Sequence, residues 1–134
     1  MSHSRRTVLA LIEHLERHER LVEVGVGRRS DVAAGLADRG RTVTATDVHE
    51  RSVPEGVRFV LDDVTDPDEA VYAGADALYA LNLPPELHRP LVALAERVNA
   101  ACYFTTLGAD QPAVPVDRTT LPGETLYTAR NRDV

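Results

Sequence analysis

Short strand-like segments alternate with helix-like segments along this chain, and this alternation is the strongest constraint on its fold. Strand patterns fall at residues 21–24, 41–47, 57–61, 76–81 and 101–106. Helical spacing, caps and stops predict helices over 5–19, 31–39, 66–74 and 87–98. Strands that alternate with helices over short connections form a parallel sheet covered on both faces.

The last quarter of the chain carries weaker signals. The proline-bearing stretch 108–123 predicts a loop or excursion, and 125–130 predicts a last strand. We therefore expect an α/β, Rossmann-like, doubly wound fold, with a mainly parallel sheet of five to six strands preceded by an amino-terminal helix. The expected strand order is 3-2-1-4-5, with the sixth strand beside the fifth at an edge. A ligand crevice should then open where strands 1 and 4 diverge.

The chain has 134 residues, which is an ordinary size for one domain. We expect a single domain, with an amphipathic helix over 1–20, a wound core over 21–107, and a loop and last strand over 108–134. No apolar run approaches the roughly 20 residues that span a bilayer. The basic start of the chain leads into a charged helix instead of the apolar stretch of a signal peptide. These features predict a cytoplasmic protein without membrane attachment.

Arginine supplies all 15 basic side chains, against 21 acidic ones, which gives a formal net charge of -6. Lysine is normally among the commonest residues, so its absence beside an acidic surface indicates an archaeal, halophilic source. In molar salt the Debye length falls to roughly 3 Å, and the acidity then reflects the solvent more than a partner. The chain also lacks the basic footprint of a nucleic-acid binder.

The segment Glu23-Val24-Gly25-Val26-Gly27 joins the first strand to the next helix. Glycines at such a place allow a tight turn and a close approach of a ligand, while the helix amino terminus presents free N–H groups. Asp47 ends the second expected strand, where a carboxylate can accept hydrogen bonds from both ribose hydroxyls. The pattern predicts an adenosine-containing small molecule as ligand. A turn glycine and a solvated strand-end acid are the alternative interpretation.

Glu23 helps to choose among adenosine ligands. In nicotinamide and flavin domains the position two before the first glycine is usually apolar, whereas a carboxylate suits a ligand with an ammonium group, such as S-adenosylmethionine. Asp63, after the third strand, could accept a hydrogen bond from the adenine amino group. Ser30 only approximates the third small residue of the dinucleotide pattern. NAD or another adenosine nucleotide is the alternative cofactor.

Several of these residues resemble the motifs of class I S-adenosylmethionine-dependent methyltransferases: Glu23-x-Gly25-x-Gly27, Asp47, Asp63 and the turn Asn82-Leu83-Pro84-Pro85. Over about residues 5–130 the chain resembles, more closely, a small uncharacterised archaeal family of short Rossmann-like proteins related to these enzymes.

The methyltransferase resemblance implies a role for each motif. The loop 25–27 would pass beside the methionine part of the cofactor, and Glu23 would support its amino group. Asp47 would hold the ribose and Asp63 would reach the adenine. Asn82 would lie where amino-methylating enzymes orient the target nitrogen with an asparagine amide.

The chain also departs from the methyltransferase pattern. Arg29 replaces the third glycine of the loop, so Arg28 and Arg29 either bind a phosphate or pair with surface acids. Leu83 interrupts the Asn-Pro-Pro turn. His88, near the expected crevice mouth, is the candidate general base. No metal site is expected, because a helical histidine pair (His14 and His18) lacks a third ligand.

Three functions fit these observations. The first is an S-adenosylmethionine-binding, methyltransferase-like domain of unknown acceptor, catalytic or not. The second is a regulatory module that binds a dinucleotide or adenosine nucleotide, and the third is a scaffold that has lost ligand binding. Because the chain lacks the long insertions that form a substrate lid, an active enzyme would need a homodimer, a protein partner or a macromolecular substrate to complete its site.

Overall fold

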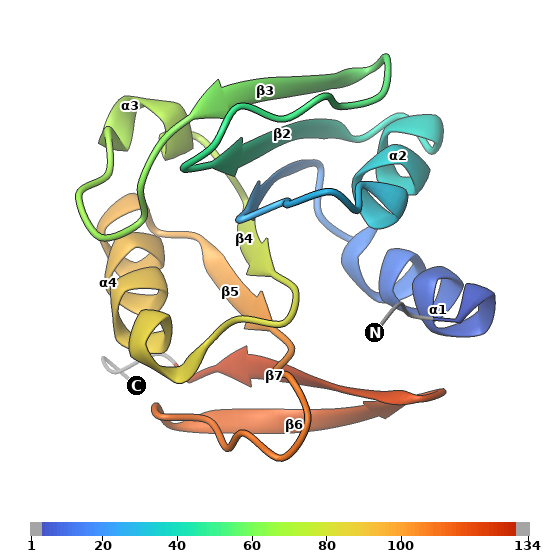
Figure 1. The fold of residues 1–134 in the computed structure, drawn as a ribbon, viewed down its shortest axis with the longest axis vertical. Coiled ribbons are helices and arrows are strands. Elements are labelled where there is room, and N and C mark those ends of the chain that lie inside the picture. Colours follow the sequence, from blue (N-terminus) through green and yellow to red (C-terminus); the bar gives the residue numbers. More distant parts are fainter. Residues whose placement is uncertain (1–3, 131–134) are drawn as a thin grey trace.

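The strands form one seven-stranded sheet in the computed structural model, which describes residues 4–130 (Figure 1). They are β1 (Arg20–Val24), β2 (Thr42–Asp47), β3 (Val57–Leu61), β4 (Ala77–Ala80), β5 (Ala101–Phe104), β6 (Val116–Leu121) and β7 (Glu124–Ala129). Their order in the sheet is β3-β2-β1-β4-β5-β7-β6. β1 to β5 are parallel, and β7 is antiparallel to both of its neighbours. The expected Rossmann-like fold and the order 3-2-1-4-5 are confirmed.

Helices cover both faces of the sheet: α1 (Arg5–Leu15), α2 (Asp31–Asp38), α3 (Glu69–Tyr72) and α4 (His88–Val98), the last preceded by a 3-10 turn, η1 (Pro85–Leu87). α1 and α2 lie on one face and α3 and α4 on the other (Figure 1). A hydrophobic core lies on each face of the sheet, and successive side chains of β1 point into one core and then the other. Leu21 packs in the core under α1 and α2, and Val22 packs in the core under α3 and α4. The sheet is therefore buried on both faces, as its apolar strands predict.

The region between β5 and the chain end differs from the expectation. The stretch 108–123, expected to be a loop or excursion, contains β6, so the sheet has a seventh strand. Only Val116 of β6 is buried, and such an edge strand lacks the apolar alternation that reveals a strand in a sequence. The strand expected at 125–130 is β7. It lies beside β5 as expected, and β6 takes the edge position.

The β6–β7 hairpin is connected to the first helix. Its turn is Pro122-Gly123, and Gly123 has φ +75°. Thr7 is buried in α1 and its hydroxyl donates a hydrogen bond of 2.6 Å to the carbonyl oxygen of Pro122. Ser4 caps α1 by accepting a hydrogen bond from the Thr7 N–H group. The amino-terminal helix thus fastens the antiparallel end of the sheet.

Two local features test the expected helix boundaries. The helix expected over 66–74 is shorter than predicted, because α3 begins at Glu69, where the Asp68 carboxylate accepts from the Ala70 N–H group. Pro90 lies in the first turn of α4, where no intrahelical N–H donor is needed. Within residues 4–130, no helix is long and apolar enough to cross a membrane. Residues 1–3, the beginning of the basic segment that was expected not to be a signal peptide, lie outside the described residues.

Candidate functional site

A cavity of about 200 Å³ lies at the carboxyl ends of the parallel strands. This is the edge where open α/β sheets bind ligands, and the strand order reverses there between β1 and β4. The cavity is lined by Val24, Gly25, Thr46, Asp47, Val48, Asp62, Asp63, Val64, Leu81, Asn82, Leu83, Pro84 and Leu87. Four of the predicted site residues thus lie together: Gly25, Asp47, Asp63 and Asn82.

Asp47 is the best anchored of these side chains. It is buried, with one carboxylate oxygen accepting from the Gly27 N–H group at 2.8 Å and the other from the His49 N–H group at 2.9 Å. Burial by itself would raise the pKa of Asp47. The backbone donors and the nearby Arg51 guanidinium outweigh it and hold this pKa below its ordinary value. A charged carboxylate therefore sits at the cavity wall, fixed in orientation.

The glycine turn takes its shape from positive φ angles. Gly25 has φ +72° and Gly27 has φ +62°, a region that favours glycine, and a Cβ atom at either position would meet open space. Gly25 lines the cavity, and its N–H group donates to the carbonyl oxygen of Thr46. Gly27 lies outside the lining and is tied to the site through Asp47. The turn is thus fastened to the end of β2.

Two acids follow β3, and they are held differently. The Asp62 carboxylate accepts from the Tyr72 hydroxyl at 2.6 Å and from the Asp68 N–H group at 3.1 Å. Asp63 is exposed, and its Oδ1 accepts from both the hydroxyl and the N–H group of Thr65. These two hydrogen bonds lower the pKa of Asp63. Asp63 therefore presents a charged group at the cavity mouth.

Asn82 follows β4 in a left-handed conformation, with φ +55°. Its N–H group donates to the hydroxyl oxygen of Thr105 at 2.8 Å, and Thr105 is fully buried at the end of β5. The next N–H group, of Leu83, donates to the Thr105 carbonyl oxygen. Thr105 thus holds the turn that carries Asn82 at the cavity.

Glu23 lies outside the cavity lining. It is 1% exposed, and it accepts a 2.8 Å hydrogen bond from the hydroxyl of Tyr79, which is also buried. Burial raises the pKa of Glu23 to about 8, although the Tyr79 hydrogen bond opposes the shift. The side chain is therefore neutral at pH 7. It presents no charged carboxylate to the cavity.

Among the described residues, the histidines and Arg29 also fall outside the cavity lining. His88 as general base is wrong: it is fully buried, its Nε2 donates to the Leu83 carbonyl oxygen, and its Nδ1 accepts from the Ala113 N–H group. His14 and His18 contact the ring of Tyr103. Among the described residues, no group of three or more potential ligands could hold a metal ion. Arg29 is exposed at a separate small hollow.

Two residues that shape this site, Arg51 and Thr105, were not predicted from the sequence. Arg51, four residues after Asp47, places its Nε 3.4 Å from the Asp47 Oδ1. Thr105 holds the Asn82 turn from another strand. A motif search could not find either residue. Thr105 contacts Asn82, which is distant in sequence, and the contact of Arg51 with Asp47 depends on the path of the loop that connects them. Val48, whose side chain is 57% exposed, adds an apolar rim.

The sheet order and the cavity at its carboxyl edge define a Rossmann-like α/β protein. Solved structures share this fold. An RNA methyltransferase from Salinibacter ruber in complex with S-adenosyl-L-homocysteine aligns with TM-score 0.66 at 16% identity, over 96% of this chain and 92% of that one. A fibrillarin/Nop5p complex aligns with TM-score 0.62 at 12% identity, over 84% and 73%.

The chain belongs to the family described as "Uncharacterised protein family (UPF0146)", whose model matches residues 6–131. A UPF0146 protein of Halobacterium salinarum is 58% identical over 118 residues, which cover 87% of this chain and 92% of the relative. One from Archaeoglobus fulgidus is 48% identical over 91 residues, which cover 68% and 70%. The resemblance to a small archaeal family related to class I methyltransferases is confirmed.

Proposed function

We propose that this protein binds S-adenosylmethionine in the cavity at the carboxyl ends of β1, β2 and β4. The proposal rests on the charge of the side chains that line this cavity. It contains three carboxylates, Asp47, Asp62 and Asp63, and no basic side chain. A sulfonium and an ammonium group are attracted to such a site, whereas a pyrophosphate is repelled. The ligand-bound Salinibacter ruber enzyme, similar in fold, supports the same class of ligand.

The residues present fit the parts of this cofactor. The Asp47 Oδ2 atom accepts from the Gly27 N–H group and keeps a second lone pair for a ribose hydroxyl, whereas Oδ1 faces His49 N–H and Arg51. Asp63 is placed to accept from the adenine amino group, and Val48 and Val64 supply apolar walls. Gly25 leaves room for the methionine part, since nothing lies within 4 Å of a Cβ built there. Glu23 would contribute indirectly: its side chain lies outside the cavity lining and links β1 to β4 by accepting a hydrogen bond from Tyr79.

The cofactor, when bound, supplies an electrophilic methyl group, and the protein contributes by positioning the donor and the acceptor. Asn82, fixed by Thr105, is the polar side chain at the mouth that could orient an acceptor. This site fits a methyltransferase whose acceptor is not identified, and it also fits a regulatory protein that binds the cofactor without turnover. NAD or another adenosine nucleotide is the alternative ligand, and the exposed pair Arg28 and Arg29 would serve its phosphates.

Calorimetric titration in molar KCl tests the proposal. The wild type should bind S-adenosylhomocysteine and S-adenosylmethionine, and NAD and ATP should bind more weakly. Asp47→Asn should weaken S-adenosylhomocysteine binding by about 1.5 to 3 kcal/mol, because it removes a charge-assisted hydrogen bond. Asp38→Asn, at the exposed end of α2, is the matched control and should bind like the wild type. Binding of NAD or ATP without S-adenosylhomocysteine would overturn the proposal.

A further inference from the structure

One face of α4 is left open to solvent. Arg89, Val92, Ala93 and Glu96 follow the spacing i, i+3, i+4, i+7, so they lie on the same face of the helix. Arg89 and Glu96 are exposed, and Val92 and Ala93 are half-buried. The opposite side of the helix packs on the sheet through His88, Leu91, Leu94 and Ala95. We call the four open residues the α4 face.

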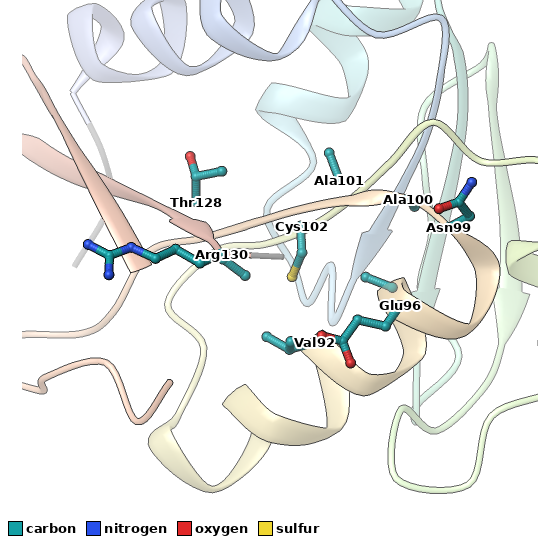
Figure 2. Close-up of a pocket in the computed structure, with 10 residues that line it drawn as sticks. Val92, Glu96, Asn99, Ala100, Ala101, Cys102, Thr128 and Arg130 are labelled. Carbon is teal, nitrogen blue, oxygen red and sulfur yellow. The ribbon is translucent and has the colours of Figure 1, made fainter. Parts of the chain in front are cut away.

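Two neighbouring hollows extend along the α4 face, with volumes of about 360 and 400 Å³. Val92, Glu96 and Arg130 line both of them. Figure 2 shows the first hollow, with Val92 and Glu96 projecting from α4 on one side and Thr128 and Arg130 on the other. The second is walled by Ala113-Val114-Pro115. In the described chain, the connection from β5 to β6 contains no helix that would fill this space.

The charges on the α4 face have no ion-pair partners among the residues that the structure describes. Among residues 4–130, neither Arg89 nor Glu96 forms an ion pair. Seven residues of helix separate them by about 10 Å, which is too far for a direct contact. Arg130, the other charged residue of the hollows, pairs with Asp117. The helix thus presents one cation and one anion on either side of a small apolar centre.

This order of residues is complementary to itself. When two copies of the helix lie antiparallel, with a two-fold axis between Val92 and Ala93, Val92 of each copy faces Ala93 of the other. Arg89 of each copy then faces Glu96 of the other, so the contact contains two opposite-charge pairs. An isologous interface requires this reciprocity. The small Ala93 side chain also favours the close approach of 8 to 10 Å at which helices pack.

We propose that the α4 face binds the α4 face of a second copy, and that the protein is a homodimer through this contact. Each α4 helix would enter the hollow beside the other one. None of its four residues lines the cavity at the carboxyl ends of the strands. The inference therefore stands whether or not that cavity binds S-adenosylmethionine.

Charge reversal with sedimentation equilibrium in 0.2 M KCl tests the interface, because molar salt would screen the opposite-charge pairs. The wild type should be a dimer. Arg89→Glu places two acids opposite each other at both ends of the contact, and Glu96→Arg places two arginines there. Each single variant should weaken dimerisation at least tenfold. The double variant Arg89→Glu with Glu96→Arg should restore it, and a mixture of the two single variants should form heterodimers. Arg58→Glu, exposed on β3, is the control and should remain dimeric.

The three substituted positions, Arg89, Glu96 and Arg58, are exposed, and circular dichroism verifies that each variant is folded. A monomeric wild type at 100 µM, whatever fills the hollow, would overturn the proposal. So would a dimer that both single variants leave intact, because another surface would then hold it. A double variant that stays monomeric would show that the reversals act without the predicted pairing, and would reject the antiparallel register.

Discussion

Two carboxyl groups at neighbouring strand ends have opposite pKa shifts, and the difference comes from their partners. Glu23 is buried with a single hydroxyl donor, and its pKa rises to about 8. Asp47 is also buried, but two backbone N–H groups and Arg51 stabilise its charge, so its pKa falls. The sequence predicted both acids as site residues. It could not predict their charge, because a pKa depends on burial and on donors brought in by the fold.

The raised pKa of Glu23 predicts a specific pH dependence of stability. The unfolded chain releases the Glu23 proton near the ordinary value of 4.5, while the folded protein holds it to about pH 8. This proton therefore contributes stability that is full below pH 4.5 and is lost as the pH rises toward 8. Glu23→Gln should remove that loss, and its stability relative to wild type should rise by at least about 1 kcal/mol between pH 5 and pH 8.

Urea unfolding at both pH values measures this difference. Glu13→Gln is the matched control, since Glu13 is exposed on α1. It should retain the wild-type slope. If Glu23→Gln and the wild type showed the same pH dependence, Glu23 would be ionised in the folded protein.

At the scale of elements, His88 joins three segments that are distant in sequence. It begins α4, donates to the turn after β4 at Leu83, and accepts from Ala113 in the connection to β6. Its ring also packs on Phe104, with ring centroids 4.4 Å apart. His88→Ala should therefore lower the free energy of unfolding by about 2 to 4 kcal/mol, because it leaves a buried acceptor at Leu83 and a half-buried donor at Ala113 unpaired.

The matched control is His49→Ala, because the His49 side chain is exposed and only its backbone N–H group holds Asp47. It should change stability by less than about 0.5 kcal/mol. Denaturant midpoints measure both variants. Equal effects at the two histidines would show that the buried hydrogen bonds of His88 add nothing.

The elements that could be predicted from sequence are those with a strong local pattern. β1 and β4 are buried on both faces and appear as short apolar runs, and β2 is rich in β-branched residues. α4 shows its buried stripe at helical spacing. β6 could not be found in this way, because five of its six residues are exposed or half-buried. The cavity residues at strand ends were predicted for a related reason: parallel strands bring their carboxyl ends to one edge. Arg51 and Thr105 depend on tertiary contacts.

For the whole molecule, the excess of acids over arginines predicts how stability responds to salt. The net charge of -6 repels itself at low ionic strength. Most ion pairs in residues 4–130 are solvent-exposed and contribute little, so their screening costs little. The free energy of unfolding should therefore be higher in 2 M than in 0.2 M KCl. The relative in Halobacterium salinarum fits this expectation.

Urea titration at the two salt concentrations measures the effect, since urea carries no charge of its own. A neutral osmolyte such as sucrose, at matched water activity, is the control and separates screening from general exclusion. A protein that loses stability on going to 2 M KCl would show that attractive pairs outweigh the net repulsion.

The hydrogen bond from Thr7 to Pro122 spans 115 residues of sequence. A ribosome releases the amino-terminal segment first, so α1 leaves the exit tunnel long before the hairpin that it fastens exists. α1 can meet α2 early, but its attachment to the β6–β7 turn must wait for nearly the whole chain. Contacts so distant in sequence slow folding, because the loop between them must close first. Although α1 is synthesised before the other described helices, its hydrogen bond to the β6–β7 turn can form only after the hairpin has been synthesised.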